Sequence, residues 1–154
     1  MQADSEHRGV SLSAQLLGTW ELVSRTDHNA SGEIKAEPTL GADPVALLYY
    51  DGSGHFAAQF MKRDRSGIAE TAGPAGPNNS RAVGGYDAYF GTYSVDDERG
   101  TATQKLLGSL SAENVGQVLT REMTVVGDAL TIALDTTTAE GETVTRTLVW
   151  KRVG

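Results

Sequence analysis

The sequence lacks cysteine, an excess of positive charge and long apolar runs. No cysteine occurs among the 154 residues, which excludes disulfides, thiol chemistry and zinc–thiolate sites. The chain has 13 Lys and Arg residues against 20 Asp and Glu residues, a net charge of −7. Nucleic acids and anionic membranes bind basic patches, so we expect neither as a partner. Because no apolar run approaches the length of a membrane span and no signal-peptide core follows the polar first residues, we expect a cytoplasmic protein.

Signature motifs of several enzyme classes are missing as well. The chain has no G-x-S-x-G elbow, no P-loop and no G-x-G-x-x-G turn, so nucleophilic serine chemistry, nucleotide-phosphate binding and dinucleotide binding have no support. The three histidines, His7, His28 and His55, lack the spacing of metal ligands. The acidic run at 96–98 lacks the spacing of a calcium loop. We therefore predict no metal site and no cofactor.

Residues 45–61, VALLYYDGSGHFAAQFM, are typical of a β-hairpin. Two apolar runs flank the sequence DGSG, in which glycine adopts a positive φ at little cost and aspartate can bond its own backbone. In the second run Phe56, Ala58 and Phe60 share one face, and the opposite face is also partly apolar. Such a strand is covered on both faces or lines a cavity on one of them.

Alternation of apolar and polar residues with a period of two indicates further strands. We expect them at 19–24, 89–95, 101–110, 117–126, 129–135 and 143–151, with a loop or weak strand around 33–36. About eight strands, short turns rich in glycine and no βαβ alternation favour an all-β fold, a single antiparallel β-barrel. A barrel of this size is either filled by side chains or holds one small ligand.

Three segments lie outside this strand pattern. We expect residues 1–10 to form a flexible N-terminal tail and residues 11–154 to form the barrel domain, beginning with a short serine-capped helix within 11–17. Residues 62–85 show no strand pattern and contain the sequence GPAGPNN. A loop of this length in a small β domain is either a lid over a binding site or a mobile insertion, and the sequence leaves both open.

Polar residues interrupt three faces that are predicted to point inward. Arg121, Arg146 and Gln104 each lie on an otherwise apolar face, and these faces, as assigned, carry no Asp or Glu. A buried guanidinium group needs an anionic partner. Either a ligand supplies it as a carboxylate or an enolate, or the arginines reach water or pair with Asp135 or Glu142 at the rim.

Seven segments also follow the order and spacing of a known family. They are LLGTWELVS (16–24), DPV (43–45), YYDGSG (49–54), AQFM (58–61), YDAYFGTY (86–93), GDALT (127–131) and LVWKR (148–152). Together they resemble the bacterial and fungal lipocalin-like domains, a resemblance that covers residues 16–152. It implies a small calycin-like barrel with a cavity, and similar barrels in natural-product pathways act as cofactor-free cyclases. The family often has histidine where this chain has Gln104 and Lys105, which argues against a histidine-based acid/base or metal role there.

Two functions are consistent with such a barrel. The first is a small-molecule-binding protein that encloses a mostly apolar or amphiphilic ligand with an acidic or carbonyl end. The alternative is a cofactor-free cyclase or isomerase that folds a polyketide- or polyene-like intermediate into a reactive shape. A filled structural barrel is a third alternative, against which the Ala, Gly and Thr of the walls argue. The sequence leaves a homodimer open.

The inward faces supply the candidate site residues. The catalytic candidates are Tyr93, Gln104 and Arg121, which could polarise a carbonyl as hydrogen-bond donors. The candidates for ligand binding are Trp20, Tyr49, Phe56, Ala58, Phe60, Tyr89, Leu106, Met123, Ile132, Arg146, Leu148 and Trp150.

Overall fold

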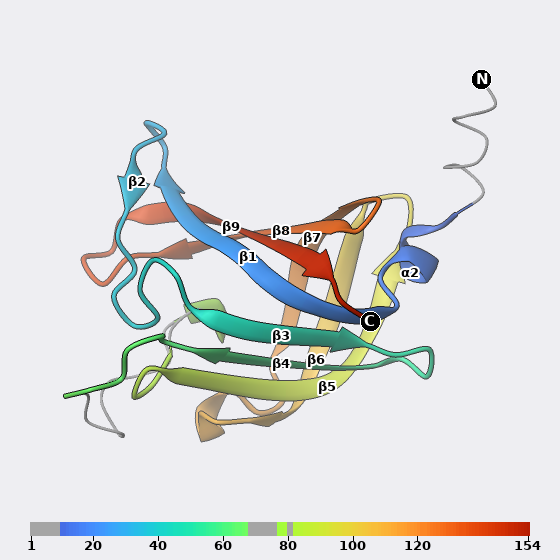
Figure 1. Cartoon of the computed structure of the whole chain (residues 1–154), viewed down its shortest axis with the longest axis horizontal. Helices are drawn as coiled ribbons and strands as arrows, with labels where there is room; N and C mark the ends of the chain where they lie inside the picture. The colour runs from blue at the N-terminus through green and yellow to red at the C-terminus, as the bar shows by residue number, and fades with distance from the viewer. Residues whose placement is uncertain (1–9, 68–76, 80–81) are drawn as a thin grey trace.

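The structure, a computed structural model, describes residues 10–67, 77–79 and 82–154. In these residues nine strands form one antiparallel sheet (Figure 1). The strands are β1 (Gly18–Asn29), β2 (Ile34–Lys35), β3 (Val45–Tyr50), β4 (His55–Met61), β5 (Tyr86–Asp96), β6 (Thr101–Ser109), β7 (Val118–Val126), β8 (Ala129–Thr137) and β9 (Thr143–Arg152). Their order in the sheet is β2-β1-β3-β4-β5-β6-β7-β8-β9, and β1 also pairs with β9. The expected antiparallel barrel is therefore confirmed, with β2 as an addition to eight barrel strands.

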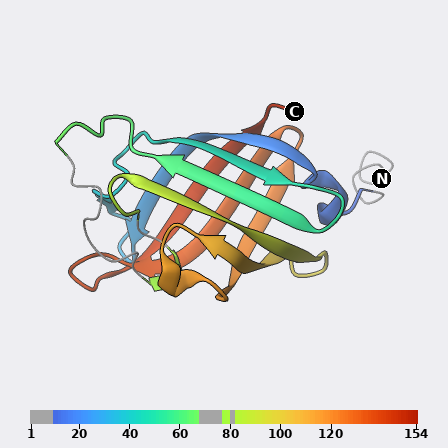
Figure 2. The same cartoon turned by 90° about the horizontal axis from the view of Figure 1, so that it is seen from below.

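Pairing between the first and last barrel strands closes the sheet. It runs from Trp20 opposite Arg152 to Asn29 opposite Val144. In Figure 2 the strands β3 to β5 cross in front of β8 and β9, which is the tilt that closure of a barrel requires. Closure gives both β1 and β9 a partner on each side, so neither presents an unpaired edge.

A β-bulge in β1 decides which of its residues point inward. The pairing of β1 with β9 shifts by one residue between Leu22 and Ser24, so Val23 has no partner in the ladder. An extra residue reverses the alternation of faces beyond it. Arg25 and Asp27 are therefore buried inside the barrel, whereas Ser24 is exposed.

Two boundaries predicted from the sequence were wrong. The first strand continues beyond residue 24 to Asn29 because its second half pairs with β9, and only Ile34–Lys35 forms a strand in the segment that follows. Strand β5 begins at Tyr86 rather than residue 89 because residues 86–88 pair with β4. Both extensions bring polar residues into the barrel wall.

The predicted short helix forms and closes one end of the barrel. Helix α2 (Leu12–Gln15) is capped by Ser11, whose hydroxyl accepts a backbone N–H of the first turn at 3.2 Å. Trp20 donates its indole N–H to the carbonyl of Leu16 at 2.9 Å. The guanidinium of Arg152 lies 4.3 Å from the centre of the Trp20 ring and donates to two backbone carbonyls near the helix end. No helix in the described ranges is long and apolar enough to cross a membrane.

The long segment between β4 and β5 reaches the other end of the barrel. Of the predicted loop, residues 62–67, 77–79 and 82–85 are described. They include the 3₁₀ helix η1 (Pro77–Asn79), which contacts β8 through a hydrogen bond from the Asn78 amide to the carbonyl of Asp135. A second 3₁₀ helix, η2 (Ala112–Asn114), packs against it. Most of the sequence GPAGPNN and the predicted tail, apart from Val10, lie outside the described residues.

Candidate functional site

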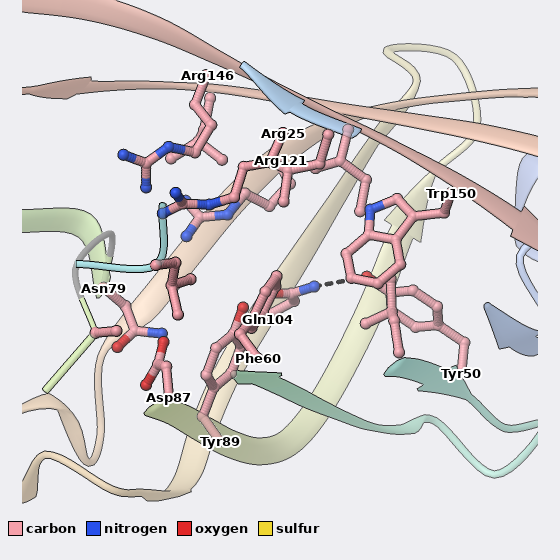
Figure 3. Close-up of a pocket in the computed structure, with 16 residues that line it drawn as sticks. Arg25, Tyr50, Phe60, Asn79, Asp87, Tyr89, Gln104, Arg121, Arg146 and Trp150 are labelled. Atoms are coloured by element: carbon pink, nitrogen blue, oxygen red, sulfur yellow. Dashed lines mark hydrogen bonds between the residues drawn. The ribbon is translucent and has the colours of Figure 1, made fainter. Parts of the chain in front are cut away.

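A cavity lies inside the barrel beside η1 (Figure 3). Its volume is about 50 Å³, which is room for a few water molecules. Apolar residues form one part of the lining, namely Leu40, Leu48, Phe60, Ala82, Ile132, Leu134, Leu148 and Trp150. Polar residues form the other part, namely Arg25, Tyr50, Asn79, Asp87, Tyr89, Gln104, Arg121 and Arg146. The lining is therefore about half apolar and half polar.

Two of the three arginines in the lining have carboxylate partners. Arg146 donates from Nε to Asp27 Oδ1 at 2.7 Å and from Nη2 to Asp27 Oδ2 at 3.0 Å. Arg25 donates from Nη1 to Glu37 Oε1 at 2.9 Å. As expected, the inner faces of β6, β7 and β9 carry no Asp or Glu. The carboxylate for Arg146 comes instead from β1, where the bulge turns Asp27 into the barrel. The rim partners considered for Arg146, Asp135 and Glu142, were wrong, since its carboxylate partner is Asp27.

Arg121 differs from the other two arginines in the charge of its partners. It projects from β7, is 5% exposed and donates from Nη1 to Asn78 Oδ1 at 2.8 Å and from Nη2 to the Asn78 carbonyl at 2.9 Å. Burial lowers the pKa of Arg121. Among the described residues, no carboxylate lies within ion-pair distance of its guanidinium group. Arg121 is thus a buried cation held by neutral oxygens.

Asp87 supplies a buried carboxyl group to the same cavity. Burial raises the pKa of Asp87 to about 7, and the Ala88 backbone N–H and the charge of Arg25 only partly oppose this rise. Within the described part of the chain no cation lies within 4.0 Å of this carboxyl. Next to it on the same face, burial raises the pKa of Tyr89 to about 12, which keeps that hydroxyl protonated.

Away from Asp87 and Asn79, Figure 3 shows Gln104, Tyr50 and Trp150 toward the other side of the cavity. Gln104 donates from Nε2 to the Tyr50 hydroxyl at 2.7 Å. Burial raises the pKa of Tyr50, so it stays a neutral hydroxyl. The Trp150 ring meets Phe60 edge to face, with 5.6 Å between ring centres. This side combines aromatic walls with a few polar atoms.

The structure gathers many, but not all, of the predicted site residues at this cavity. The predicted residues that line it are Phe60, Tyr89, Gln104, Arg121, Ile132, Arg146, Leu148 and Trp150. Four others, Phe56, Ala58, Leu106 and Met123, are buried elsewhere in the core. Trp20 belongs to the closed end, Tyr49 is 38% exposed, and Tyr93 donates to the carbonyl of Asp51 at the hairpin turn.

Several lining residues were missed from the sequence. Alternation counted backward from Tyr89 would have placed Asp87 on the inward face, so that signal was present. Arg25 had no such signal, because its orientation depends on the bulge at Val23. Asn79 lies in a segment without periodicity, where no pattern predicts which side chain meets the barrel. In the ranges that the structure describes, no three His, Asp or Glu side chains cluster as metal ligands do.

Comparison with known proteins gives one result that covers almost the whole chain. A protein-family model described as a lipocalin-like domain matches residues 17–153. No curated protein matches the chain. The matched residues include every strand from β1 to β9 and thus the complete closed barrel and its cavity. The chain belongs to the lipocalin-like domain family.

Proposed function

We propose that the barrel binds a small, mostly apolar molecule that carries an acidic group, and that Arg121 contacts this group. The proposal rests on a difference between the arginines of the cavity in the charge of their partners. Arg146 and Arg25 have carboxylate partners, whereas the partners of Arg121 among the described residues are the two oxygens of Asn78. A buried cation gains most from an anion, and the planar guanidinium fork suits two oxygens of one acid group.

The contacts of Asn78 indicate where the acid group would lie. Its amide oxygen and backbone carbonyl receive the two parallel N–H groups of Arg121 at 2.8 and 2.9 Å, as the two oxygens of a carboxylate would. A ligand acid would therefore replace Asn78 at this fork. Because the cavity measures about 50 Å³ and pockets for drug-sized ligands measure roughly 300–1,000 Å³, we expect a compact ligand and movement of the side chains around it.

Binding of phenylacetate tests this proposal against its neutral analogue phenylacetamide. We expect phenylacetate to raise the melting temperature and to change Trp fluorescence, since Trp150 lines the cavity, while phenylacetamide does so much less. In Arg121→Met the affinity for phenylacetate should fall roughly 10- to 100-fold, the loss typical of a charge-assisted contact. Equal binding of acid and amide, or unchanged affinity in Arg121→Met, would contradict the proposal.

A matched variant controls for general loss of positive charge. Arg63 lies on the surface, 62% exposed in its side chain, where it pairs with Asp43. Arg63→Met removes the same charge without touching the cavity, so its affinity for phenylacetate should equal that of the unmodified protein. Circular dichroism of both variants establishes that each retains the barrel.

A cofactor-free isomerase or cyclase is the second candidate, and Asp87 favours it. A carboxyl with a pKa near neutrality is suited to accept and return a proton. Asp87 would take a proton from the carbon beside a carbonyl, the C–H electron pair would form an enolate whose oxygen pairs with Arg121, and Asp87 would return the proton at another carbon. The product is an isomer, and no co-reactant is consumed.

Hydrogen–deuterium exchange at the methylene carbon of phenylpyruvate tests this second candidate. In D₂O the unmodified protein should accelerate exchange above the buffer rate, and Asp87→Asn should return it to that rate. The surface variant Asp64→Asn should keep the acceleration, because Asp64 bonds only Ser66 in its own turn among the described residues. No acceleration by the unmodified protein, or full acceleration by Asp87→Asn, would contradict proton transfer by Asp87.

A further inference from the structure

Three polar side-chain atoms in the cavity lining have no hydrogen-bond partner among the described residues. One is the amide Nδ2 of Asn79, beside Asp87; the other two, toward the opposite side of the cavity, are the indole Nε1 of Trp150 and the amide Oε1 of Gln104. Trp150 and Gln104 are 1% and 3% exposed, so bulk water does not reach them. Figure 3 shows both side chains directed into the interior of the cavity. Buried polar groups are almost always paired, so an unpaired donor and an unpaired acceptor in one cavity indicate what the cavity can bind.

The unpaired atoms of Trp150 and Gln104 have complementary hydrogen-bonding roles. The Trp150 indole can only donate. Gln104 donates its Nε2 to the Tyr50 hydroxyl at 2.7 Å, which leaves Oε1 as an acceptor. This side of the cavity therefore offers one donor and one acceptor to an occupant.

Both side chains lie toward the side of the cavity away from Asn79 and Asp87 (Figure 3). Gln104 starts on β6 and crosses the interior to reach Tyr50 on β3. Trp150 projects from β9, which is separated from β3 only by β1. The acid contact at Arg121 lies instead beside η1 and Asn78. The cavity thus has polar groups in two places, and its lining also includes apolar residues such as Phe60, which contacts the Trp150 ring.

We propose that the ligand carries a hydroxyl or enol group opposite its acidic end, and that Trp150 and Gln104 bind this group. The ligand oxygen accepts from Trp150 Nε1, and the ligand hydroxyl donates to Gln104 Oε1. A carbonyl would satisfy only Trp150, and an alkyl group would satisfy neither. The ligand class is therefore a small hydroxy acid with an apolar middle. The acidic end rests on the function proposed for Arg121, whereas the hydroxyl subsite stands on Trp150 and Gln104 alone.

This subsite would act mainly on specificity. Water can satisfy the pair in a protein without ligand, but a ligand with an alkyl end displaces that water and leaves both atoms unpaired. Sites that hydrogen-bond a ligand hydroxyl reject analogues without it far more strongly than apolar pockets reject an added methylene. We therefore expect discrimination of at least about tenfold between a hydroxyl and a methyl group of similar size.

Calorimetric titration with 4-hydroxyphenylacetate and 4-methylphenylacetate measures this discrimination. The unmodified protein should bind the hydroxyl compound at least about tenfold more tightly. Trp150→Phe removes the donor and keeps an aromatic ring, and Gln104→Met removes the acceptor; each should reduce the preference to less than about threefold. Gln59→Met, on the exposed face of β4, should retain the full preference. No preference in the unmodified protein, or a full preference in both cavity variants, would overturn the proposal.

Phenol and toluene test the hydroxyl subsite independently of the acid contact. In ¹⁵N-labelled Arg121→Met, phenol should shift the indole N–H resonance of Trp150, assigned by its loss in Trp150→Phe, and toluene should shift it much less. If phenylacetate and phenylacetamide bind equally while phenol still shifts this resonance, the acid contact fails and the hydroxyl subsite stands. If phenylacetate binds through Arg121 while phenol and toluene shift the Trp150 resonance equally, the proposed hydroxyl subsite is wrong. In that case only water pairs with Trp150 Nε1 and Gln104 Oε1.

Discussion

Asp27 and Arg146 face each other across the β1–β9 pairing and form a two-point ion pair inside the barrel, with N–O distances of 2.7 and 3.0 Å. Their side chains are only 3% and 5% exposed. The pair sits on the two strands that close the barrel. Asp27 therefore neutralises the charge of Arg146. Among the arginines that line the cavity, Arg121 is the one whose partners in the described residues are neutral.

Loss of the Asp27 carboxylate should destabilise the protein strongly. Asp27→Asn leaves the Arg146 guanidinium buried without this counter-charge, which typically costs about 3–5 kcal/mol of unfolding free energy. Asp43→Asn breaks an exposed pair with Arg63 and should cost less than about 1 kcal/mol. Urea denaturation at pH 7 measures both values. Similar small losses in the two variants would show that the buried pair contributes little.

The bulge in β1 should tolerate deletion of its extra residue. Removing Val23 makes the β1–β9 pairing continuous and leaves Arg25 and Asp27 facing inward. Removing Thr26 instead turns Asp27 to the outer face and separates it from Arg146. We therefore expect the Thr26 deletion to lose at least about 3 kcal/mol more unfolding free energy than the Val23 deletion. Equal losses in urea denaturation would contradict the assignment of Val23 as the bulge residue.

Asp87 should make the protein less stable as the pH rises toward neutrality. Burial raises its pKa from 3.8 to about 7 in the folded protein. The folded state therefore binds a proton that the unfolded state has released. The stabilisation is complete below about pH 4 and is lost as the pH passes through 7, with a total on the order of a few kcal/mol.

A pH series of melting temperatures for Asp87→Asn isolates this effect. The variant should match the unmodified protein near pH 4 and exceed its stability at pH 8. Asp64→Asn is a control for which the change in stability with pH has the opposite sign, because hydrogen bonds from Ser66 lower the pKa of Asp64. Parallel pH curves for the unmodified protein and Asp87→Asn would show that Asp87 does not titrate in this range.

Gly91 should resist substitution because β5 and β6 approach each other closely there. A Cβ atom at Gly91 would lie 1.8 Å from the carbonyl oxygen of Lys105. This is a backbone atom in a paired strand at a register shift, so relief requires the strands to separate. Gly91→Ala should cost at least about 3 kcal/mol or prevent folding. Gly52→Ala, where no atom lies within 4 Å of the added Cβ, should change stability by less than about 0.5 kcal/mol, measured by thermal denaturation.

Much of the architecture follows from local patterns in the chain. The alternation in β4 correctly placed Phe56, Ala58 and Phe60 on the inner face, because side chains of a paired strand point to opposite faces in turn. The DGSG turn formed between β3 and β4 for an equally local reason, since Asp51 accepts hydrogen bonds from the backbone of Ser53 and His55. The same alternation placed Gln104, Arg121 and Arg146 inside the barrel.

The pairing of charges inside the barrel depends on contacts between distant strands. One extra residue, Val23, reverses the faces of β1 and brings Asp27 to Arg146, which is 119 positions away in the chain. Asn78 reaches Arg121 from a segment with no periodic pattern. The sequence thus determines which side chains enter the barrel wherever alternation is unbroken. Only the folded chain decides which of them meet, because a strand's register and a loop's path are set by packing against partners that local sequence does not identify.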